Sequence, residues 1–264
     1  MASFSVVSNI ASANAQANLS TNNIGLQRTL NRLSSGYRIN YSGDDAAGLA
    51  VANGYRADQA VLNQGISNAN DGLSTLQIMD GALNNISMLL DRLATLASQS
   101  ASAGFTGNRM TLNSEFTAIK DEIDRESGVA SLNAVQNFSV FVGSGSTVGG
   151  AIGEVTANAM TLDTSSIESD TAAKAAVDAV TNAVGTLGGV QGSIGTLENR
   201  LQFAVALGQS QVVNIKAAES RIRDANVAEE SANMTRYNIL NQSGIAVLAQ
   251  ANQSSSAVLA LLRG

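Results

Sequence analysis

The sequence contains no proline, no cysteine and no histidine, and it also lacks tryptophan. Without cysteine the chain forms no disulfide and offers no thiol nucleophile or thiolate metal ligand. Without histidine it lacks the commonest general base and metal ligand of proteins. Because proline interrupts helices, its absence permits long continuous ones. Most familiar enzyme chemistry is therefore excluded, and long helices are favoured.

Aromatic residues make up only 4% of the 264 residues, whereas 44% are hydrophobic. A core of small aliphatic side chains favours helices that lie side by side. No run approaches the roughly 18 consecutive apolar residues of a membrane span. The start, MASFSVVSNIASANA, lacks the basic and apolar regions of a cleaved secretory signal. These features alone predict a cytosolic protein.

Charge is distributed unevenly along the chain. Residues 1–42 carry three arginines and no acid, a net charge of +3, whereas residues 43–221 carry 9 basic and 18 acidic residues, a net charge of −9. The last 43 residues hold three of each, which gives −6 overall. Scattered arginines with few aromatic residues argue against nucleic-acid binding.

Two long segments repeat apolar residues at the a/d-type spacing of helices that pack on a neighbour. The stripes consist of Leu62, Ile66, Ala69, Leu73, Leu76, Met79, Leu83, Ile86, Leu90, Leu93 and Leu96, and of Val177, Val180, Val184, Leu187, Val190, Ile194, Leu197, Leu201 and Val205. The first helix would be about 50 Å long. We predict a mainly α fold of long antiparallel helices in a coiled-coil-like bundle.

A shorter helix is predicted over residues 110–126, with Asn108 as its N-cap. A small β-hairpin is predicted at about residues 137–162. In that hairpin NFSVFV alternates like a strand, GSGSTVGG is the loop, and EVTANAMTLD returns as the second strand.

The two chain ends carry thin apolar stripes whose opposite faces are mostly Asn, Ser, Thr and Gln. These stripes are the predicted assembly residues: Val6, Ile10, Ala13, Ala17, Ile24, Leu30 and Leu33, and Met234, Tyr237, Ile245, Leu248, Val258 and Leu262. Nine glycines elsewhere fall inside predicted helices and cost about 7 to 9 kcal/mol against alanine. Such helices are marginal alone and depend on neighbours.

The helical pattern breaks at LSSGYRINYSGDDAAGLAVA, where Gly36 and Gly43 precede Asp44 and Asp45. The two carboxylates resemble a catalytic or metal-binding pair. Because they directly precede a helical stretch, we interpret them instead as N-cap and first-turn residues, which accept backbone N–H bonds.

No other motif carries recognisable chemistry. GSGSTVGG lacks the Gly-Lys-Ser/Thr end of a phosphate loop, and GGVQGSIG follows no strand. Without histidine a nucleophilic serine would need one of three lysines as its base. We predict no catalytic residue, cofactor or metal, and an acid pair among the 21 acidic residues is the enzymatic alternative that stays open.

Long stretches resemble the conserved ends of bacterial flagellins. These are NRLSSGYRINYSGDDAAGLAVANGYRA, NANDGLSTLQIMDGALNNISMLLDRLATLASQSA and DEIDRESG near the start, and ESRIRDANVAEESANMTRYNILNQSGIAVLAQANQ with LALLR near the end. The resemblance covers about residues 1–128 and 172–264. The chain is similar to a minimal flagellin without the variable outer domains.

The resemblance implies an architecture. Residues 1–42 and 222–264 would form a discontinuous inner-tube domain, and residues 43–221 an outer-tube domain with the hairpin. The break, with Gly36, Arg38, Gly43, Asp44 and Asp45, would be the spoke that joins them.

The resemblance also implies a function and partners. The chain would polymerise with itself, non-covalently, into the helical flagellar filament that drives motility. It would meet an export chaperone, a type III export apparatus, and filament cap and hook-junction proteins. Export without a cleaved signal to the extracellular flagellum would replace the cytosolic prediction. The alternatives are a hook-filament junction protein of the same superfamily and a coiled-coil adhesin or fibre protein.

Some flagellins are recognised by Toll-like receptor 5 through an Arg-Val-Arg-Glu-Leu pattern. The corresponding positions here are Arg92, Leu93, Ala94, Thr95 and Leu96, with Gln99 and Glu115 also matching. Ala94 and Thr95 replace an arginine and a glutamate, so receptor activation is predicted to be weak or absent.

Overall fold

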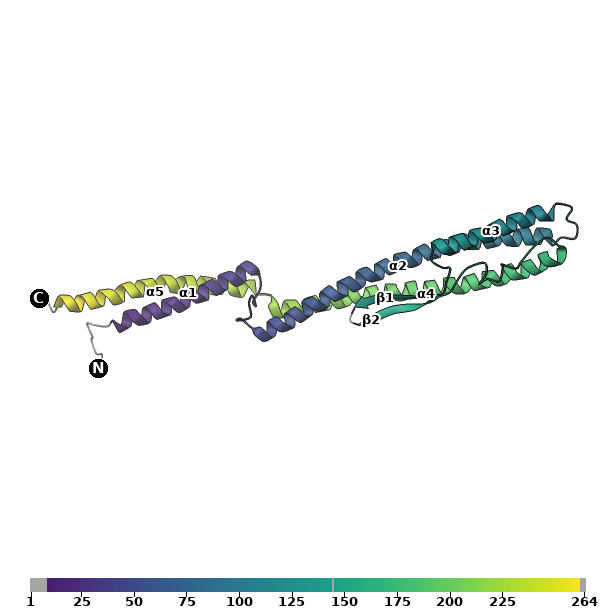
Figure 1. Cartoon of the computed structure of the whole chain (residues 1–264). Helices are drawn as coiled ribbons and strands as arrows, with labels where there is room; N and C mark the ends of the chain where they lie inside the picture. The colour runs from purple at the N-terminus through teal and green to yellow at the C-terminus, as the bar shows by residue number, and fades with distance from the viewer. Residues whose placement is uncertain (1–8, 144, 262–264) are drawn as a thin grey trace. The chain divides into compact units, whose positions relative to one another are not determined.

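The structure is a computed structural model that describes residues 9–143 and 145–261, with side chains described as far as residue 253. In this part of the chain the elements are α1 (Ile10–Ser35), α2 (Ala46–Ser100), α3 (Arg109–Val129), β1 (Gln136–Gly143), β2 (Ser146–Ile152), α4 (Asp170–Arg223) and α5 (Val227–Leu261) (Figure 1). The mainly α fold with a small hairpin is confirmed.

Residue contacts divide the chain into two compact units. The terminal unit is Met1–Ala57 with Ile215–Gly264, and the central unit is Asp58–Asn214. The boundaries between these units fall within α2 and α4. The predicted boundaries, at residues 42/43 and 221/222, instead lie near the ends of helices. Each unit is described by itself below.

The core of the central unit joins α2, α3, α4 and the hairpin, and within it α2 packs on α4, as the approach of Ile66 to Gly208 shows. Leu76, Leu83 and Ile86 on α2 are fully buried, as is Ile194 on α4. These residues repeat at the spacing that buries one face of a helix against a neighbour. The two predicted stripes are therefore confirmed for most of their length.

Val184 is an exception to the second stripe. Its side chain is 43% exposed, and the adjacent Ala183 is fully buried in its place. The sequence pattern favoured the larger side chain, but the smaller Ala183 faces the core at this level. The prediction of Val184 as a core residue was wrong.

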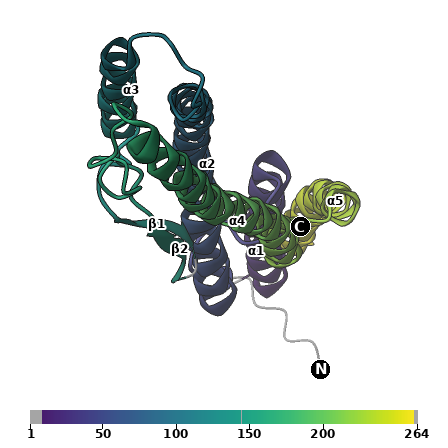
Figure 2. The same cartoon turned by 90° about the vertical axis from the view of Figure 1, so that its right-hand side faces the viewer.

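The predicted short helix is confirmed as α3, whose N-cap Asn108 accepts a hydrogen bond from the Met110 N–H. Phe116 and Ile123 of α3 are fully buried in the core. α3 runs antiparallel to α2, because Asn85 bonds to Glu126 and Arg92 to Glu115. Figure 2 shows the hairpin on one side of α2 and α4.

The second strand of the hairpin lies earlier than predicted. β2 spans Ser146–Ile152 and pairs antiparallel with β1, so GSGSTVGG supplies most of the strand instead of a loop. The turn is short, with Gly143 and Gly145 at φ 96° and 73°, which glycine adopts without strain. EVTANAMTLD, residues 154–163, lies outside the strands in turns and irregular chain.

The hairpin lies close to both long helices of the central unit. A Cβ added to Gly65 of α2 would clash with the backbone carbonyl of Val142, and one added to Gly150 would lie 3.2 Å from Leu197 of α4. By contrast, nothing lies within 4 Å of such an atom at Gly81 of α2 or Gly192 of α4. Some helix glycines are therefore required by packing within the chain, and others are not.

The chain between β2 and α4 is held by Lys120 of α3. Its Nζ donates hydrogen bonds to the carbonyls of Leu162 at 3.3 Å, Asp163 at 3.0 Å and Ser165 at 3.1 Å. The lysine is 8% exposed. A buried ammonium group needs such acceptors to offset its lost hydration, so Lys120 fixes this segment on the core.

Candidate functional site

The candidate site is the pairing of the two chain-end helices in the terminal unit. α1 and α5 lie side by side and antiparallel (Figure 1). Asn9 Nδ2 donates to the Ala251 carbonyl at 2.9 Å, and Asn241 Nδ2 donates to Asn23 Oδ1 at 2.9 Å. Arg32 at the other end of α1 contacts Glu230 at 3.2 Å. These contacts set one register for the whole pair.

The seam between α1 and α5 contains few large side chains. The ring of Tyr237 lies over Gly25, where an added Cβ would come within 2.5 Å of it. Leu19 lies over Gly244, at 3.1 Å from a Cβ added there. The hydrogen bond between Asn241 and Asn23 is exposed, so it helps to fix the register but contributes little stability. The pair is specific, therefore, but only weakly stabilised within one chain.

The predicted assembly stripe of α1 does not form this seam. Ile10 is 61% exposed and Ile24 51%, and Ala13, Ala17 and Leu30 are also exposed, whereas Leu33 is half-buried. The seam instead uses Ala15, Leu19, Asn22, Leu26 and Thr29, whose steps of 4, 3, 4 and 3 are a heptad pattern in which two leucines alternate with smaller or polar residues. At 100° per residue, Ile10, Ala17 and Ile24 lie on the opposite face.

The predicted stripe of α5 divides between two faces. Met234, Tyr237 and Leu248 are half-buried, whereas Ile245 is 60% exposed. Ile239 and Val247, which the sequence prediction missed, are 58% and 57% exposed. Val6 and Leu262 lie outside the described residues, as does the side chain of Val258. Each helix thus presents apolar side chains that its partner does not cover.

The chain break at residues 36–45 forms a compact joint with the connection before α5. Gly36 ends α1 in the left-handed conformation at φ 74°, and its N–H bonds to the Arg32 carbonyl. Its own carbonyl accepts from the Ala225 N–H at 2.8 Å, and the Arg38 N–H donates to the Arg223 carbonyl at 2.6 Å. The two connectors are therefore hydrogen-bonded to one another along their backbones.

Side chains strengthen the same joint. The Arg38 guanidinium donates to the Ile222 carbonyl at 2.6 Å. The guanidinium carbon of Arg223 lies 4.3 Å from the centre of the Tyr37 ring, which is a cation–π contact. Gly43 does not have a positive φ, and a Cβ there would lie 3.0 Å from the Tyr41 ring.

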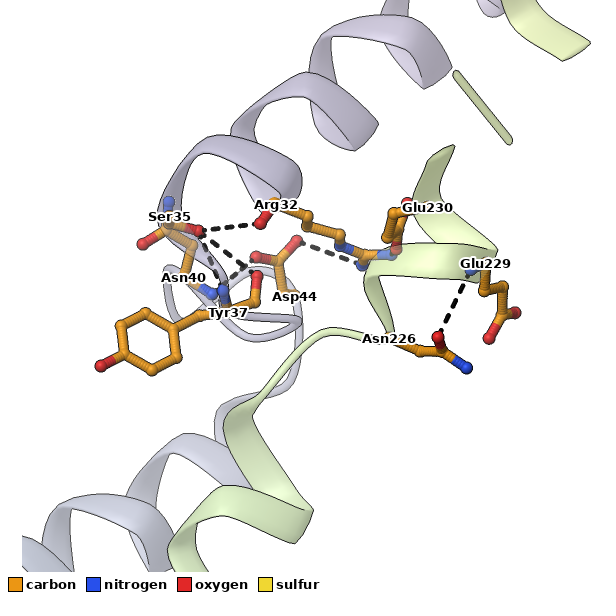
Figure 3. A network of polar contacts seen from close by, with 8 residues as sticks. All are labelled: Arg32, Ser35, Tyr37, Asn40, Asp44, Asn226, Glu229 and Glu230. Carbon is orange, nitrogen blue, oxygen red and sulfur yellow. Dashed lines mark hydrogen bonds and ion pairs between the residues drawn. The ribbon is translucent and has the colours of Figure 1, made fainter. Parts of the chain in front are cut away.

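Asp44 and Asp45 act on the backbone around them. Asp45 Oδ1 accepts from the Gly48 N–H at 2.9 Å, which is N-cap geometry at the start of α2. Asp44 Oδ2 accepts from the Asn40 N–H at 3.2 Å, and Asp44 Oδ1 lies 4.0 Å from Arg32 (Figure 3). Both carboxylates are therefore committed to the fold of the joint.

Arg32 connects three segments at this joint. It extends from α1 to Asp44 and to Glu230 in the first turn of α5 (Figure 3). Glu230 is only 7% exposed, and Asn226 caps the same helix by accepting from the Ala228 and Glu229 N–H groups. No local pattern predicts this ion pair, because its residues are 198 positions apart.

Replacing Arg32 by alanine is expected to destabilise the joint by about 1 to 3 kcal/mol, because Glu230 stays buried without its partner. Glu230→Gln, which removes the charge and keeps the shape, is expected to cost less. A double-mutant cycle on the temperature at which assembled protein dissociates measures the coupling. Additive effects of the two substitutions would contradict the pairing.

The positions that correspond to receptor-facing residues lie on α2 and α3. Arg92 Nε donates to Glu115 Oε1 at 2.9 Å, so these two are paired with each other. Thr95 and Gln99 are exposed, and Ala94 is half-buried against the core. Leu96 is 1% exposed and belongs to the α2–α4 stripe, so its assignment as an outward-facing position was wrong.

The described residues give no sign of a metal site or a membrane span. No group of three or more acidic side chains among them is placed to hold a metal ion. None of their helices combines the length and hydrophobicity that crossing a bilayer requires.

Comparison with known proteins identifies the family. Residues 6–140 match the bacterial flagellin N-terminal helical region, and residues 177–262 match the C-terminal helical region. The chain is 36% identical to a flagellin of Halalkalibacterium halodurans, covering 97% of this chain and 98% of that one. It is 33% identical to the flagellar filament 33 kDa core protein of Treponema phagedenis, with the same coverage. The chain therefore belongs to the bacterial flagellin family and is a structural subunit of a flagellar filament.

Proposed function

We propose that α1 and α5 are the elements through which copies of this chain assemble without covalent links. The observation that carries the proposal is the exposed apolar face on each helix, represented by Ile10 and Ile24 on α1 and Ile239 and Ile245 on α5. Fully covering one such side chain contributes about 1.5 to 3 kcal/mol. Several per copy would provide the stability that the thin seam lacks.

Assembly of this kind couples folding to polymerisation. Ala15 and Thr29 are the buried residues of α1, and the larger side chains of the α1–α5 seam stay half-buried, so a lone copy gains little from ordering these helices. Docking on neighbours adds the apolar burial that offsets the entropy of ordering. Copies that add head to tail through heterologous contacts do not close into a ring and so extend a helical polymer.

The layered organisation belongs to the same proposal. Residues 1–42 and 222–264 would form the inner tube and residues 43–221 the outer tube. Gly36, Arg38, Gly43, Asp44 and Asp45 would be the spoke between them. Its support is the joint itself, where the two connectors are bonded to each other and Asp45 restarts the chain as α2.

The proposed partners follow from membership of the family. They are an export chaperone, a type III export apparatus, and filament cap and hook-junction proteins. Export would proceed without a cleaved signal peptide to the extracellular flagellum. We propose no enzymatic activity, since the acid pair at residues 44–45 is engaged in capping and ion pairing.

The test of this function is seeded growth of the purified chain, followed by electron microscopy. Long filaments that extend from short seeds are expected. Growth that stops after a junction-sized layer would favour a hook-filament junction protein. A closed bundle of a few chains in sedimentation would favour an adhesin or fibre protein. Either outcome would overturn the proposal.

Recognition by Toll-like receptor 5 is proposed to be weak or absent. Ala94 and Thr95 lack the charges of the recognised pattern, and Arg92 is already paired with Glu115. A reporter-cell assay is expected to show at least about tenfold lower potency than a flagellin that carries the full pattern. Thr95→Glu, at an exposed position, is expected to raise the potency. Full potency of the unmodified chain would contradict the proposal.

A further inference from the structure

The two units of the chain carry net charges of opposite sign. The terminal unit holds nine basic and six acidic residues, a net charge of +3. The central unit holds six basic and fifteen acidic residues, a net charge of −9. This contrast raises the question of which charges are already neutralised inside each unit.

Every basic residue of the central unit is engaged within that unit. Arg92, Arg125 and Lys174 pair with nearby carboxylates, and Arg109, Lys120 and Arg200 donate to backbone carbonyls. The hydrogen bonds from Arg125 also lower the pKa of the Glu122 carboxyl from its ordinary value. The surplus charge of the central unit is therefore entirely negative.

The remaining carboxylates of the central unit face solvent. Among the described residues, the exposed carboxylates without an ion-pair or hydrogen-bond partner are Asp58, Asp71, Asp91, Asp121, Asp163 and Asp178. They are distributed over α2, α3, α4 and the segment before α4. No described cation of the same unit is left to neutralise them.

The terminal unit shows the reverse arrangement. Its described carboxylates are engaged in ion pairs or hydrogen bonds, apart from the side chain of Glu229. Five exposed cations have no partner in the described chain: Arg28, Arg56, Lys216, Arg221 and Arg236. Each unit thus carries free charges of a single dominant sign.

We propose that the free cations of the terminal unit in one copy contact the free carboxylates of the central unit in another copy. The occupant of each charged surface is a second copy of this chain, which presents the complementary charge. The free carboxylates of neighbouring central units repel one another, so contacts that place free cations against them are favoured over contacts that do not. The inference rests on the self-assembly proposed above, and it adds that complementary charge selects which surfaces of two copies meet.

Neutral substitutions distinguish pairing from general repulsion. The chain has a net charge of −6, so removing acids should ease assembly if copies merely repel one another. Pairing predicts the opposite for the triple variant Asp71→Asn, Asp91→Asn and Asp178→Asn, with roughly a tenfold rise in the critical concentration for seeded growth. Glu229→Gln is the control, because it removes a free carboxylate from the cationic unit and should not raise that concentration.

Charge reversal tests whether the pairing occurs between copies. One variant carries Lys216→Glu and Arg221→Glu, and the other carries Asp91→Lys and Asp178→Lys. Neither is expected to extend seeds alone, whereas an equimolar mixture is expected to grow, because each variant then meets a complementary partner. Circular dichroism of each variant checks that the central unit is folded.

The outcomes separate this inference from the proposed function. If the unmodified chain does not grow from seeds, self-assembly itself is refuted, and this inference with it. If it grows, but the triple Asp→Asn variant grows equally well or better, only the pairing is refuted. If the mixture does not grow, pairing between copies is also refuted, because mixing should restore the contacts between copies.

Discussion

Deleting residues 1–30 is expected to abolish filament growth, with no polymer at concentrations at least about 100-fold above those that suffice for the full chain. The deletion removes Leu19 and Gly25 from the seam, so α5 loses the partner that fixes its register. It also removes the exposed faces around Ile10 and Ile24, which would contact other copies. Both sources of stabilisation are lost together.

The same deletion should leave the central unit intact. Asp58–Asn214 contains all the buried residues of the core that α2, α3, α4 and the hairpin share, and no residue of α1 contributes to that core. Circular dichroism and thermal melting of the truncated chain measure this, and seeded growth under the microscope measures the loss of assembly. Filaments of ordinary length from the truncated chain would refute the role given to α1.

Replacing Gly65 by alanine is expected to destabilise the central unit by about 1 to 3 kcal/mol, even though alanine is the better helix former. The added methyl group would collide with the backbone carbonyl of Val142, which cannot rotate away as a side chain can. The hairpin must then move off α2, or α2 must bend. Gly65 is therefore required by the approach of β1 to the helix.

Gly81→Ala is the matched control, because it lies in the same helix with nothing within 4 Å of the added atom. It is expected to stabilise the central unit by about 0.8 to 1 kcal/mol through helix propensity alone. Denaturant unfolding of both variants gives the two free energies on one scale. Equal effects of the two substitutions would show that the hairpin contact does not determine the outcome.

The long seams were predictable because their signal is strong and local. Leu76, Leu83 and Leu90 recur at heptad intervals over many turns, and Asn108 has the position and the side chain of an N-cap. Large apolar side chains at a fixed period leave a single face to bury. The central unit was therefore predictable nearly to its helix ends.

β2 was missed because two of its residues are glycines. Gly149 and Gly150 indicated a loop by composition, but a Cβ at Gly149 would lie 2.6 Å from the Phe138 carbonyl. Glycine is present there because β1 lies close to Gly149 and Leu197 of α4 lies close to Gly150, and such approaches exist only in the folded molecule. Sequence alone cannot distinguish this use of glycine from its use in a turn.

The predicted assembly stripe of α1 and the seam that α1 forms with α5 lie on opposite faces of the helix. Hydrophobicity selected Ile10, Ala17 and Ile24, whereas the intramolecular contact uses smaller and more polar residues such as Asn22 and Thr29. If the more apolar face of α1 contacts other copies, as proposed above, its hydrophobic pattern has no explanation within a single copy. The capping of α2 by Asp45 was accessible to local reasoning, whereas the bridge from Arg32 to Glu230 was not.

The paired connectors have a mechanical consequence. The Ala225 N–H donates to the Gly36 carbonyl, and the Arg38 N–H donates to the Arg223 carbonyl. Neither connector can therefore be stretched without transferring force to the other. The two connectors pair antiparallel, and a force that separates them must break both hydrogen bonds. A subunit of a flagellar filament therefore carries load at this joint through two connectors that are linked to each other.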